Sequence, residues 1–293
     1  MKFALTLKPV APLGRLLRMA RWAEQIGFES LWLYDVPLAW MDPLPLLAAI
    51  AAHTSRLRLG VCVANPVTRA PLEMALASHT LHAMSGGRFE LGLSRGDGAA
   101  RWLARQPATL DEVRDAIHTL RTSAPSWSIG PPAVWLGTYG PRGLALAGEA
   151  ADGVILQFAD RELTAWARAC TGPEVRAMAA AAVALDVDKA RARQRVRWFV
   201  RMISEDLARI VPRVASLPAE LQEWAAAWKS ADAPRRDMLC DRMADRFALV
   251  GPASACRKRL AALEAAGVEC FNYFVLDDDD DVVMATGHML LDC

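Results

Sequence analysis

The sequence predicts an α/β fold in which eight strands alternate with helices and close into a (β/α)8 TIM barrel. Short apolar runs alternate with longer amphipathic runs, the apolar runs number eight, and a length of 293 residues is common for such barrels. A doubly wound parallel sheet fits the same alternation, but the count of eight favours the barrel. No linker or low-complexity tract divides the chain, so residues 1–293 are interpreted as one domain.

The first half of the chain has clear periodicities. Strands are expected at residues 3–7, 28–35, 56–65 and 88–94, and helices at 13–26, 43–54, 70–85 and 109–121. Gly27 and Gly86 follow two of these helices, and Thr109 with Glu112 forms a capping box at the start of another.

The second half continues the alternation. Strands are expected at residues 133–139, 152–158, 196–203 and 268–276, and helices at 141–151, 173–184, 205–246 and 252–267. Prolines interrupt the helical pattern of residues 205–246, and a helical region also contains Trp166. The connection between the fourth and fifth strand units, residues 121–133, is short.

Composition excludes several classes of protein. Hydrophobic residues at 53% and charged residues at 23% are typical of a soluble globular protein, and a net charge of +1 gives no basic field for nucleic acid. No apolar run reaches the roughly 20 residues that span a bilayer, and no export signal is recognised. The six cysteines form no CxxC pair, so we expect reduced thiols in the cytoplasm and no metal site.

Functional residues of a parallel barrel lie at the carboxyl ends of its strands. The third strand ends in Cys62, Val63, Ala64 and Asn65, followed by Pro66. Proline cannot donate a backbone hydrogen bond and restricts the residue before it, so the chain must leave the sheet abruptly here. A simple strand exit explains the pattern as well as a binding site does.

The fourth strand is followed by Ser94, Arg95, Gly96 and Asp97. Backbone amides in such a loop can approach a phosphate, with Arg95 as the opposite charge. The spacing matches neither the dinucleotide fingerprint nor the P-loop, and an ordinary solvated loop fits equally well.

Gly140, Pro141 and Arg142 begin the helix after the fifth strand. The exposed amides and the positive end of the helix dipole suit an anionic group. Most βα loops share this geometry, so the surrounding glycines are the only distinguishing feature.

Two other patterns are given structural interpretations. His79 and His82 lie three residues apart on a helix but lack a third ligand, and the acidic run 277–281 lacks the spacing of a calcium loop.

Five segments resemble the luciferase-like superfamily of flavin and deazaflavin oxidoreductases. They occur in family order over nearly the whole chain: GFESLWLYD, RLRLGVCVANPVTRAP, LHAMSGGRFELGLSRGD, WLGTYGPRGLALAGEAADGVIL and FALVGPASACRKRLAALEAAGVECF. The NPxTR, SGGRFxLGxxRGD and LAGExADG segments look most similar to the branch containing methylenetetrahydromethanopterin reductase, which uses coenzyme F420. Monooxygenases that use flavin mononucleotide (FMN) are more distant neighbours.

The resemblance implies a barrel whose cofactor lies across the carboxyl-terminal mouth, with its ring against the third strand. It implies a bulge there with a non-prolyl cis peptide between Cys62 and Val63, so that residues 62–65 support the ring. Further positions that match the cofactor pocket or the loop near its phosphate are Asp35, Asn65, residues 94–97 and residues 140–142.

The sequence also departs from the family pattern. Thr6 and Val36 stand where many relatives have an acid and a histidine, so the proton donor is unassigned and Asp35 and Lys8 are the catalytic candidates. Arg69 is a candidate partner for an acidic cofactor tail. Relatives carry an insertion where residues 121–133 are short, so we expect a more open mouth or one closed by a partner subunit.

These observations together predict a cytoplasmic oxidoreductase that transfers a hydride between reduced coenzyme F420 and a small organic substrate. One alternative is an FMN-dependent monooxygenase that uses oxygen. Another is a non-catalytic flavin-binding barrel, since fold alone does not establish activity. A homodimer through the second and third helices is expected at the family level, and neither nucleic acid nor membrane is expected as a partner.

Overall fold

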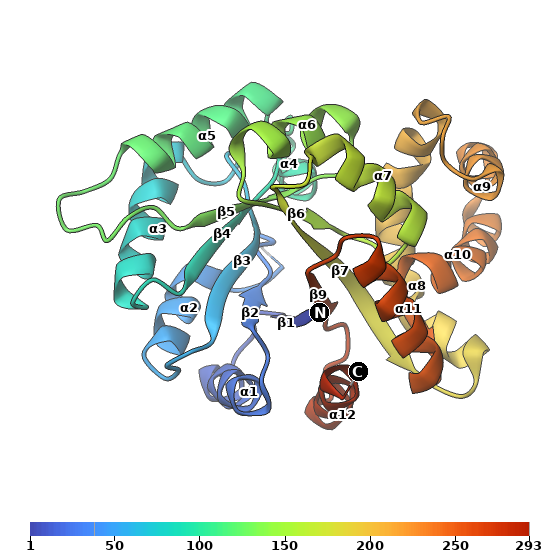
Figure 1. Ribbon diagram of the computed structural model, residues 1–293, viewed down its shortest axis with the longest axis horizontal. Helices are drawn as coiled ribbons and strands as arrows, with labels where there is room; N and C mark the ends of the chain where they lie inside the picture. The colour runs from blue at the N-terminus through green and yellow to red at the C-terminus, as the bar shows by residue number, and fades with distance from the viewer. Residues whose placement is uncertain (38, 293) are drawn as a thin grey trace.

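The computed structural model describes residues 1–37 and 39–292, and its core is a closed barrel of eight parallel strands (Figure 1). The order around the barrel is β1-β2-β3-β4-β5-β6-β7-β9, and β9 pairs with β1 to close it. The strands are β1 (Lys2–Leu7), β2 (Ser30–Leu33), β3 (Arg58–Ala64), β4 (Phe89–Leu93), β5 (Ala133–Gly137), β6 (Gly153–Leu156), β7 (Arg176–Leu185) and β9 (Cys270–Phe274). A short strand, β8 (Leu249–Gly251), pairs with the end of β7. The predicted (β/α)8 fold is confirmed.

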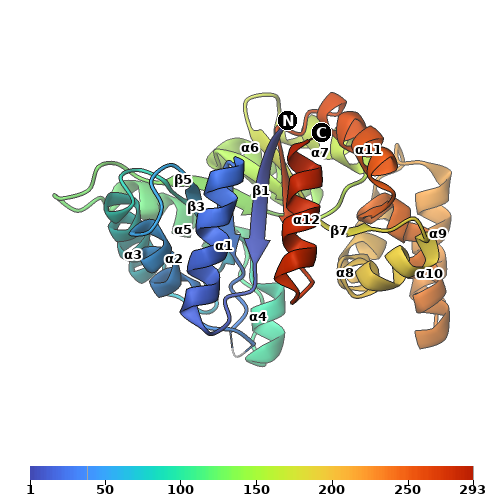
Figure 2. The same cartoon turned by 90° about the horizontal axis from the view of Figure 1, so that it is seen from below.

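Helices surround the barrel and cover its outer face (Figures 1 and 2). They are α1 (Leu13–Ile26), α2 (Pro43–Ala51), α3 (Pro71–Met84), α4 (Asp97–Trp102), α5 (Leu110–Thr122), α6 (Pro141–Ala150), α7 (Arg161–Thr171), α8 (Lys189–Ile210), α9 (Ala219–Ser230), α10 (Ala233–Phe247), α11 (Ala253–Ala265) and α12 (Asp280–Leu291). A 3-10 turn, η1 (Val211–Arg213), joins α8 to α9. Sequence analysis missed α4 and α12. Within residues 1–37 and 39–292, none of the helices has the length and apolarity needed to traverse a bilayer.

The prediction for the seventh strand is wrong. Residues 196–203, expected as a strand, lie within α8, and residues 173–184, expected as a helix, form most of β7. The run of alanines in β7 favours a helix by intrinsic propensity. Tertiary packing overrides it, because β7 pairs with β6, β9 and β8 and is buried over most of its length.

An ionic ladder joins α8 to α10. Three arginines spaced four residues apart on α8 each pair with an aspartate of α10: Arg193 with Asp245 at 2.7 Å, Arg197 with Asp241 at 2.6 Å, and Arg201 with Asp237 at 2.7 Å. Residues four apart share one face of a helix. The four-residue spacing of these arginines is typical of a helix and argues against the strand expected at residues 196–203.

A charged network occupies the interior of the barrel near the amino ends of the strands. The buried carboxylate of Glu90 accepts hydrogen bonds from Arg58 at 2.6 Å and from the indole of Trp135 at 3.0 Å. The Arg176 guanidinium lies 4.5 Å from the centre of the Trp135 ring. Side chains from β3, β4, β5 and β7 therefore meet inside the barrel around the buried carboxylate of Glu90.

The connection between α5 and β5, residues 123–132, projects from the side of the molecule (Figure 1). It enters β5 at its amino end, opposite to the mouth where the strands finish. The expectation that its short length opens the mouth is therefore wrong. The connection instead packs against α3, where His79 Nδ1 lies 2.7 Å from Ser128 Oγ.

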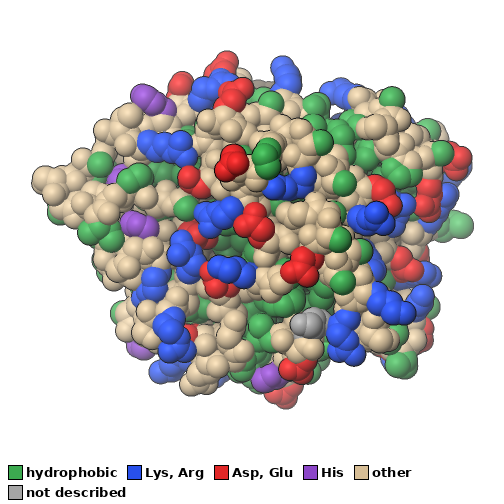
Figure 3. All heavy atoms as spheres, in the orientation of Figure 1, with side chains coloured by type: hydrophobic (Ala, Val, Ile, Leu, Met, Phe, Trp, Pro, Cys, Tyr) green, Lys and Arg blue, Asp and Glu red, His purple; other side chains and the backbone are tan. Residues whose placement is uncertain are grey.

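Charges of both signs are interspersed on the face shown in Figure 3. Arginines and lysines alternate with aspartates and glutamates there, in keeping with the net charge of +1.

A bulge interrupts β3 close to its carboxyl end. The pairing register with β4 shifts between Val61 and Ala64, and the peptide bond between Cys62 and Val63 is cis, as the resemblance implies. Glycines make room for the bulge: a Cβ at Gly92 would lie 2.2 Å from the Val61 carbonyl oxygen, and one at Gly137 would lie 3.4 Å from Val63 Cγ1.

We expect Gly92→Ala to lower the free energy of unfolding by about 2 to 3 kcal/mol, because the new methyl group overlaps backbone that cannot move independently. Gly98→Ala is the matched control, since a Cβ there has no neighbour within 4 Å and lies in a helix. Urea denaturation of both variants measures the difference. Equal stability of Gly92→Ala and the wild type would contradict the close approach.

Candidate functional site

The candidate site lies at the carboxyl ends of the strands. In Figure 2, β1 runs downward and α4 lies beyond its carboxyl end. Most of the predicted site residues lie in the loops after β2, β3, β4 and β5. Helix α8 follows β7 at the same end of the barrel. We call this end of the barrel the mouth.

Asp35 is a buried acid two residues beyond the end of β2. Its side chain is 6% exposed, and its Oδ2 lies 3.7 Å from Arg69 Nε without a hydrogen-bond partner among the described residues. Arg69 instead forms its short contact with Asp42, at 2.8 Å. Burial raises the pKa of Asp35 above its ordinary value, Asp42 raises it further, and Arg69 opposes both. The carboxyl group therefore has a free oxygen and takes up a proton readily, as acid–base chemistry requires.

The surroundings of Asp35 are apolar and aromatic. Tyr34 packs against Phe274 and Trp40, with ring centres 5.2 Å and 5.0 Å apart, and its buried hydroxyl has no partner among the described residues. Burial raises the pKa of Tyr34, and raises that of Cys62 to about 12. Both groups are therefore neutral at physiological pH and keep this part of the mouth uncharged.

Lys8, the second predicted catalytic residue, is turned away from Asp35. Its ammonium group donates to the carbonyl of Leu276 at 2.7 Å and to Asp278 at 2.9 Å. It therefore ties the end of β1 to the chain after β9, while Asp35 faces the loop after β3. The structure does not bring these two candidates together.

Asn65 shapes the loop that leaves β3. The side chain is buried, and its Oδ1 accepts hydrogen bonds from the amides of Val67 at 3.2 Å and Thr68 at 3.1 Å. Gly96 packs against it so closely that a Cβ there would lie 2.7 Å from Asn65 Oδ1. The amide side chain thus forms a turn of the kind common for asparagine.

The predicted residues after β4 also bond within their own loop. The Ser94 hydroxyl accepts a hydrogen bond from the Gly96 amide at 3.2 Å. The Ser94 amide donates to the carbonyl oxygen of the buried Ala64 at 2.9 Å. Arg95 Nε donates to the carbonyl of Ala108 at 2.7 Å. Asp97 begins α4 and is half exposed. Arg95 and Asp97 lie 3.9 Å apart as an ion pair, and both side chains are about half exposed.

The start of α6 offers a different type of site. Gly140 precedes the helix without a side-chain cap, and Pro141 and Arg142 form its first turn. Arg142 is exposed and makes no ion pair within residues 1–37 and 39–292. Uncapped amides beside a free guanidinium suit a phosphate or carboxylate.

Tyr139 and Gln157 lie at the expected ends of the fifth and sixth strands and bond to each other. The Tyr139 hydroxyl donates to Gln157 Oε1 at 2.5 Å, and burial raises the pKa of Tyr139 together with the nearby charges of Asp206 and Asp97. Asp206 lies on α8, within residues 205–246, which were expected to be helical. It was not among the expected site residues, because it lies inside that expected helix and not at the end of a strand.

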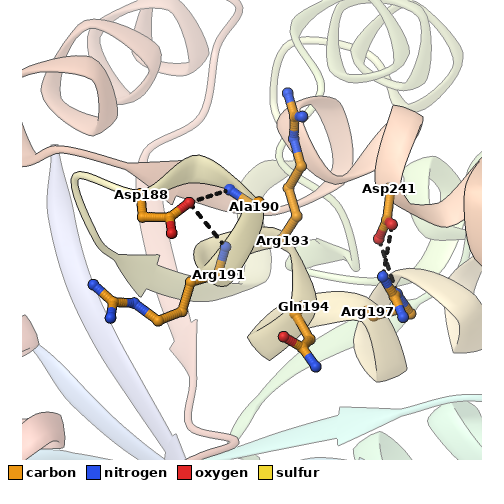
Figure 4. Close-up of a pocket in the computed structure, with 7 residues that line it drawn as sticks. All are labelled: Asp188, Ala190, Arg191, Arg193, Gln194, Arg197 and Asp241. Atoms are coloured by element: carbon orange, nitrogen blue, oxygen red, sulfur yellow. Dashed lines mark hydrogen bonds and ion pairs between the residues drawn. The ribbon is translucent and has the colours of Figure 1, made fainter.

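A pocket of about 510 Å³ lies between α8 and α10 (Figure 4). Asp188 turns back to the first amides of α8, and Arg197 points to Asp241. The other arginines of the pocket, Arg191 and Arg193, pair with Asp186 and Asp245. Because its charges already pair within the protein, this pocket belongs to the packing of the two helices.

The residues at the mouth fit a planar cofactor ring. Val63 is half-buried on the bulge, and neither Gly92 nor Gly137 places a side chain beside it. Leu33 on β2 pairs with Val61 on β3, so Tyr34 and Asp35 follow β2 at about the height along the barrel at which the bulge follows Val61. The Tyr34 hydroxyl and Asp35 Oδ2, which have no hydrogen-bond partner among the described residues, are the polar groups there. The start of α6, which has no side-chain cap, lies at the same end of the barrel.

The family of the chain is shown by comparison with known proteins. Residues 2–270 match the luciferase-like monooxygenase family, and the chain belongs to that family. It is therefore an oxidoreductase by family.

Individual relatives include both reductases and monooxygenases. The chain is 28% identical to a 5,10-methylenetetrahydromethanopterin reductase of Methanolobus tindarius, over 307 aligned residues that cover 92% of each protein. The structure of the coenzyme F420-dependent tetrahydromethanopterin reductase of Methanopyrus kandleri superposes with a TM-score of 0.76 at 19% identity, covering 98% of this chain and 97% of that one. The oxygenating constituent of 3,6-diketocamphane monooxygenase of Pseudomonas putida, bound to FMN, gives 0.70 at 15% identity, covering 99% and 96%. These structural likenesses show the shared fold.

The raised pKa of Asp35 predicts how stability depends on pH. A carboxyl group with a raised pKa in the folded protein stabilises it fully below the unfolded value near 3.8, and this contribution is lost as pH rises through the folded value. Asp35→Asn should therefore gain stability relative to the wild type between about pH 4 and pH 8.

Urea midpoints of Asp35→Asn and the wild type at both pH values measure this gain. Asp115→Asn, an exposed position on α5, is the control and should show no such trend. A difference between Asp35→Asn and the wild type that does not change with pH would contradict the burial argument.

Proposed function

We propose that this protein transfers a hydride between reduced coenzyme F420 and a small organic substrate. The observation that carries the proposal is Asp35, a buried carboxyl group with an unbonded oxygen at the level of the β3 bulge. The choice of cofactor is supported by the coenzyme F420-dependent reductase of Methanopyrus kandleri, whose structure superposes over 98% of this chain.

Reduced deazaflavin, when bound, supplies the hydride. The chain supplies the rest: Val63 supports one face of the ring, and Asp35 holds a proton or a hydrogen bond at the substrate. Tyr34 and Cys62 are neutral and buried, so they help to exclude water from the reacting atoms. The uncapped start of α6, with Arg142, binds the anionic part of the cofactor.

A monooxygenase that uses reduced FMN and oxygen is the second candidate. It is supported by the FMN-bound monooxygenase, which has the same barrel with a TM-score of 0.70. A third candidate is a barrel that binds flavin without turnover. It is supported by Asn65, Ser94 and Arg95, whose polar groups bond within their own loops.

We place the reaction in the cytoplasm. Cys62, Cys170, Cys240 and Cys270 form no disulfide with one another. Reduced thiols are the usual state in that compartment.

Equilibrium titration of the purified protein with coenzyme F420 and with FMN tests the proposal. We expect F420 to bind at micromolar concentration or below, and FMN to bind more weakly. Arg142→Ala should weaken F420 binding about 10-fold, because a charge-assisted hydrogen bond contributes about 1.5 to 3 kcal/mol. Arg21→Ala on α1, also an exposed arginine, is the control and should bind as the wild type does.

The outcome separates the three candidates. Tighter binding of FMN would favour the monooxygenase, and binding of F420 without hydride transfer to any acceptor would favour the non-catalytic barrel. Binding of neither cofactor would reject the proposal.

We also propose that the protein is a homodimer through α3 and the adjoining surface. α3 exposes Leu72, Leu76 and Met84, and the 123–132 connection beside it exposes Trp127 and Ile129. Ile129 reaches to 3.9 Å from the Cβ position of Gly87, just after α3, and the connection lies beside α3 (Figure 1). A patch of this kind on a soluble protein favours association, and a second copy offers the same patch.

Leu76→Lys should convert the dimer to a monomer, because it places a charge in the apolar interface. Sedimentation velocity of the wild type and the variant measures the mass. Met238→Lys on α10 is the matched control, since Met238 is also exposed but lies on another part of the surface. A monomeric wild type, or a variant that remains dimeric, would reject this interface.

A further inference from the structure

Arg69 lies between two aspartates and hydrogen-bonds to one of them. Its Nη2 lies 2.8 Å from Asp42 Oδ1, whereas its Nε lies 3.7 Å from Asp35 Oδ2. Neither Arg69 Nε nor Asp35 Oδ2 has a hydrogen-bond partner among the described residues. A hydrogen bond between a guanidinium and a carboxylate is normally about 2.7 to 2.9 Å long. The Arg69 and Asp35 side chains therefore face each other without completing the bond that their charges favour.

The two contacts differ because both Asp42 and Arg69 are anchored by the backbone around them. Asp42 is the N-cap of α2, where its Oδ1 also accepts a hydrogen bond from the Leu44 amide at 3.0 Å. Arg69 follows the turn that the buried Asn65 side chain closes through two backbone amides. Asp42 is thus held in place by the start of a helix, and it draws the end of the Arg69 side chain toward itself.

Burial makes Asp35 the stronger of the two possible partners for Arg69. The Asp35 side chain is 6% exposed and that of Arg69 is 18% exposed, whereas that of Asp42 is 48% exposed. Water and salt screen an exposed ion pair much more than a buried one. An ionised Asp35 would therefore attract Arg69 strongly if the contact with Asp42 were lost.

Few charged groups act on this pair. Burial raises the pKa of Asp35, Asp42 raises it further, and Arg69 lowers it. Glu73 faces Arg69 from the first turn of α3. A closer approach of Arg69 would stabilise the ionised form of Asp35, so the carboxyl group would lose its proton at a lower pH.

We propose that Asp42 is a positioning residue that holds Arg69 away from Asp35, so that Asp35 keeps the proton that an acid–base group needs. The use of that proton rests on the proposed hydride transfer, whereas the competition of two aspartates for one arginine does not. This role for Arg69 takes the place of the contact with an acidic cofactor tail, because the guanidinium already lies between two carboxyl groups.

Carbon-13 NMR of the aspartate carboxyl groups tests the inference on the purified protein without cofactor, with the Asp35 signal assigned by its loss in Asp35→Asn. Asp42→Asn should lower the titration midpoint of Asp35 by about 1 pH unit, because Arg69 then turns to the remaining carboxylate. Asparagine is as good an N-cap as aspartate, so α2 keeps its cap. Asp42→Glu retains the charge and should restore part of the wild-type midpoint. Glu73→Gln also removes a negative charge that faces Arg69, and it is the matched control with an unchanged midpoint.

A double-mutant cycle separates the two ways in which Asp42 can act on Asp35. Arg69→Gln should raise the midpoint of Asp35, and the addition of Asp42→Asn to that variant should then lower it much less than Asp42→Asn does alone. An equal drop in both backgrounds would show direct repulsion between the two carboxylates and would overturn the positioning role.

The inference and the proposed function fail in different ways. An Asp42→Asn variant that keeps the wild-type midpoint would overturn the inference and leave the hydride transfer standing. A wild type that binds neither F420 nor FMN would overturn the proposed function, while the titration of Asp35 would still decide whether Asp42 holds Arg69 away from it.

Discussion

The mouth of this barrel depends on a close approach of two backbones, where the Val61 carbonyl occupies the space that a side chain at position 92 would need. This approach lets β3 bulge toward β4 and present Val63 at the surface of the mouth. The same relation recurs one loop further, where Gly96 leaves room for Asn65. Gly92 on β4 therefore allows the bulge in β3, and Gly96 after β4 allows the turn at Asn65.

Much of the fold was predictable because the relevant signals are local. Alternating apolar and amphipathic runs identified the barrel, and the Asn65 and Pro66 exit marked the irregular strand. The exchange of β7 and α8 was not predictable in this way, since alanine favours a helix until neighbouring strands bury it on both sides. Pairing between distant segments, such as that of Arg197 with Asp241, was equally invisible in a single sequence.

The candidate site was predictable in position but less so in role. Asp35 lies at the mouth with a free oxygen, as an acid–base group requires, whereas Lys8 and Arg95 are held by backbone carbonyls. A sequence shows which residues follow a strand, but not which of them are bonded to the surrounding loops.

The ladder between α8 and α10 repeats every four residues on both helices. Sliding one helix by a single turn, about 5.4 Å, would bring Arg193 opposite Asp241 and Arg197 opposite Asp237, so two of the three pairs would form again. The ion pairs therefore select the facing surfaces and the antiparallel orientation but are degenerate along the axis. Side chains that do not repeat, such as Phe199, must set the axial position. A substitution that changes the volume of the side chain at Phe199 would therefore shift α8 along its axis. The loss of one ion pair would shift it less.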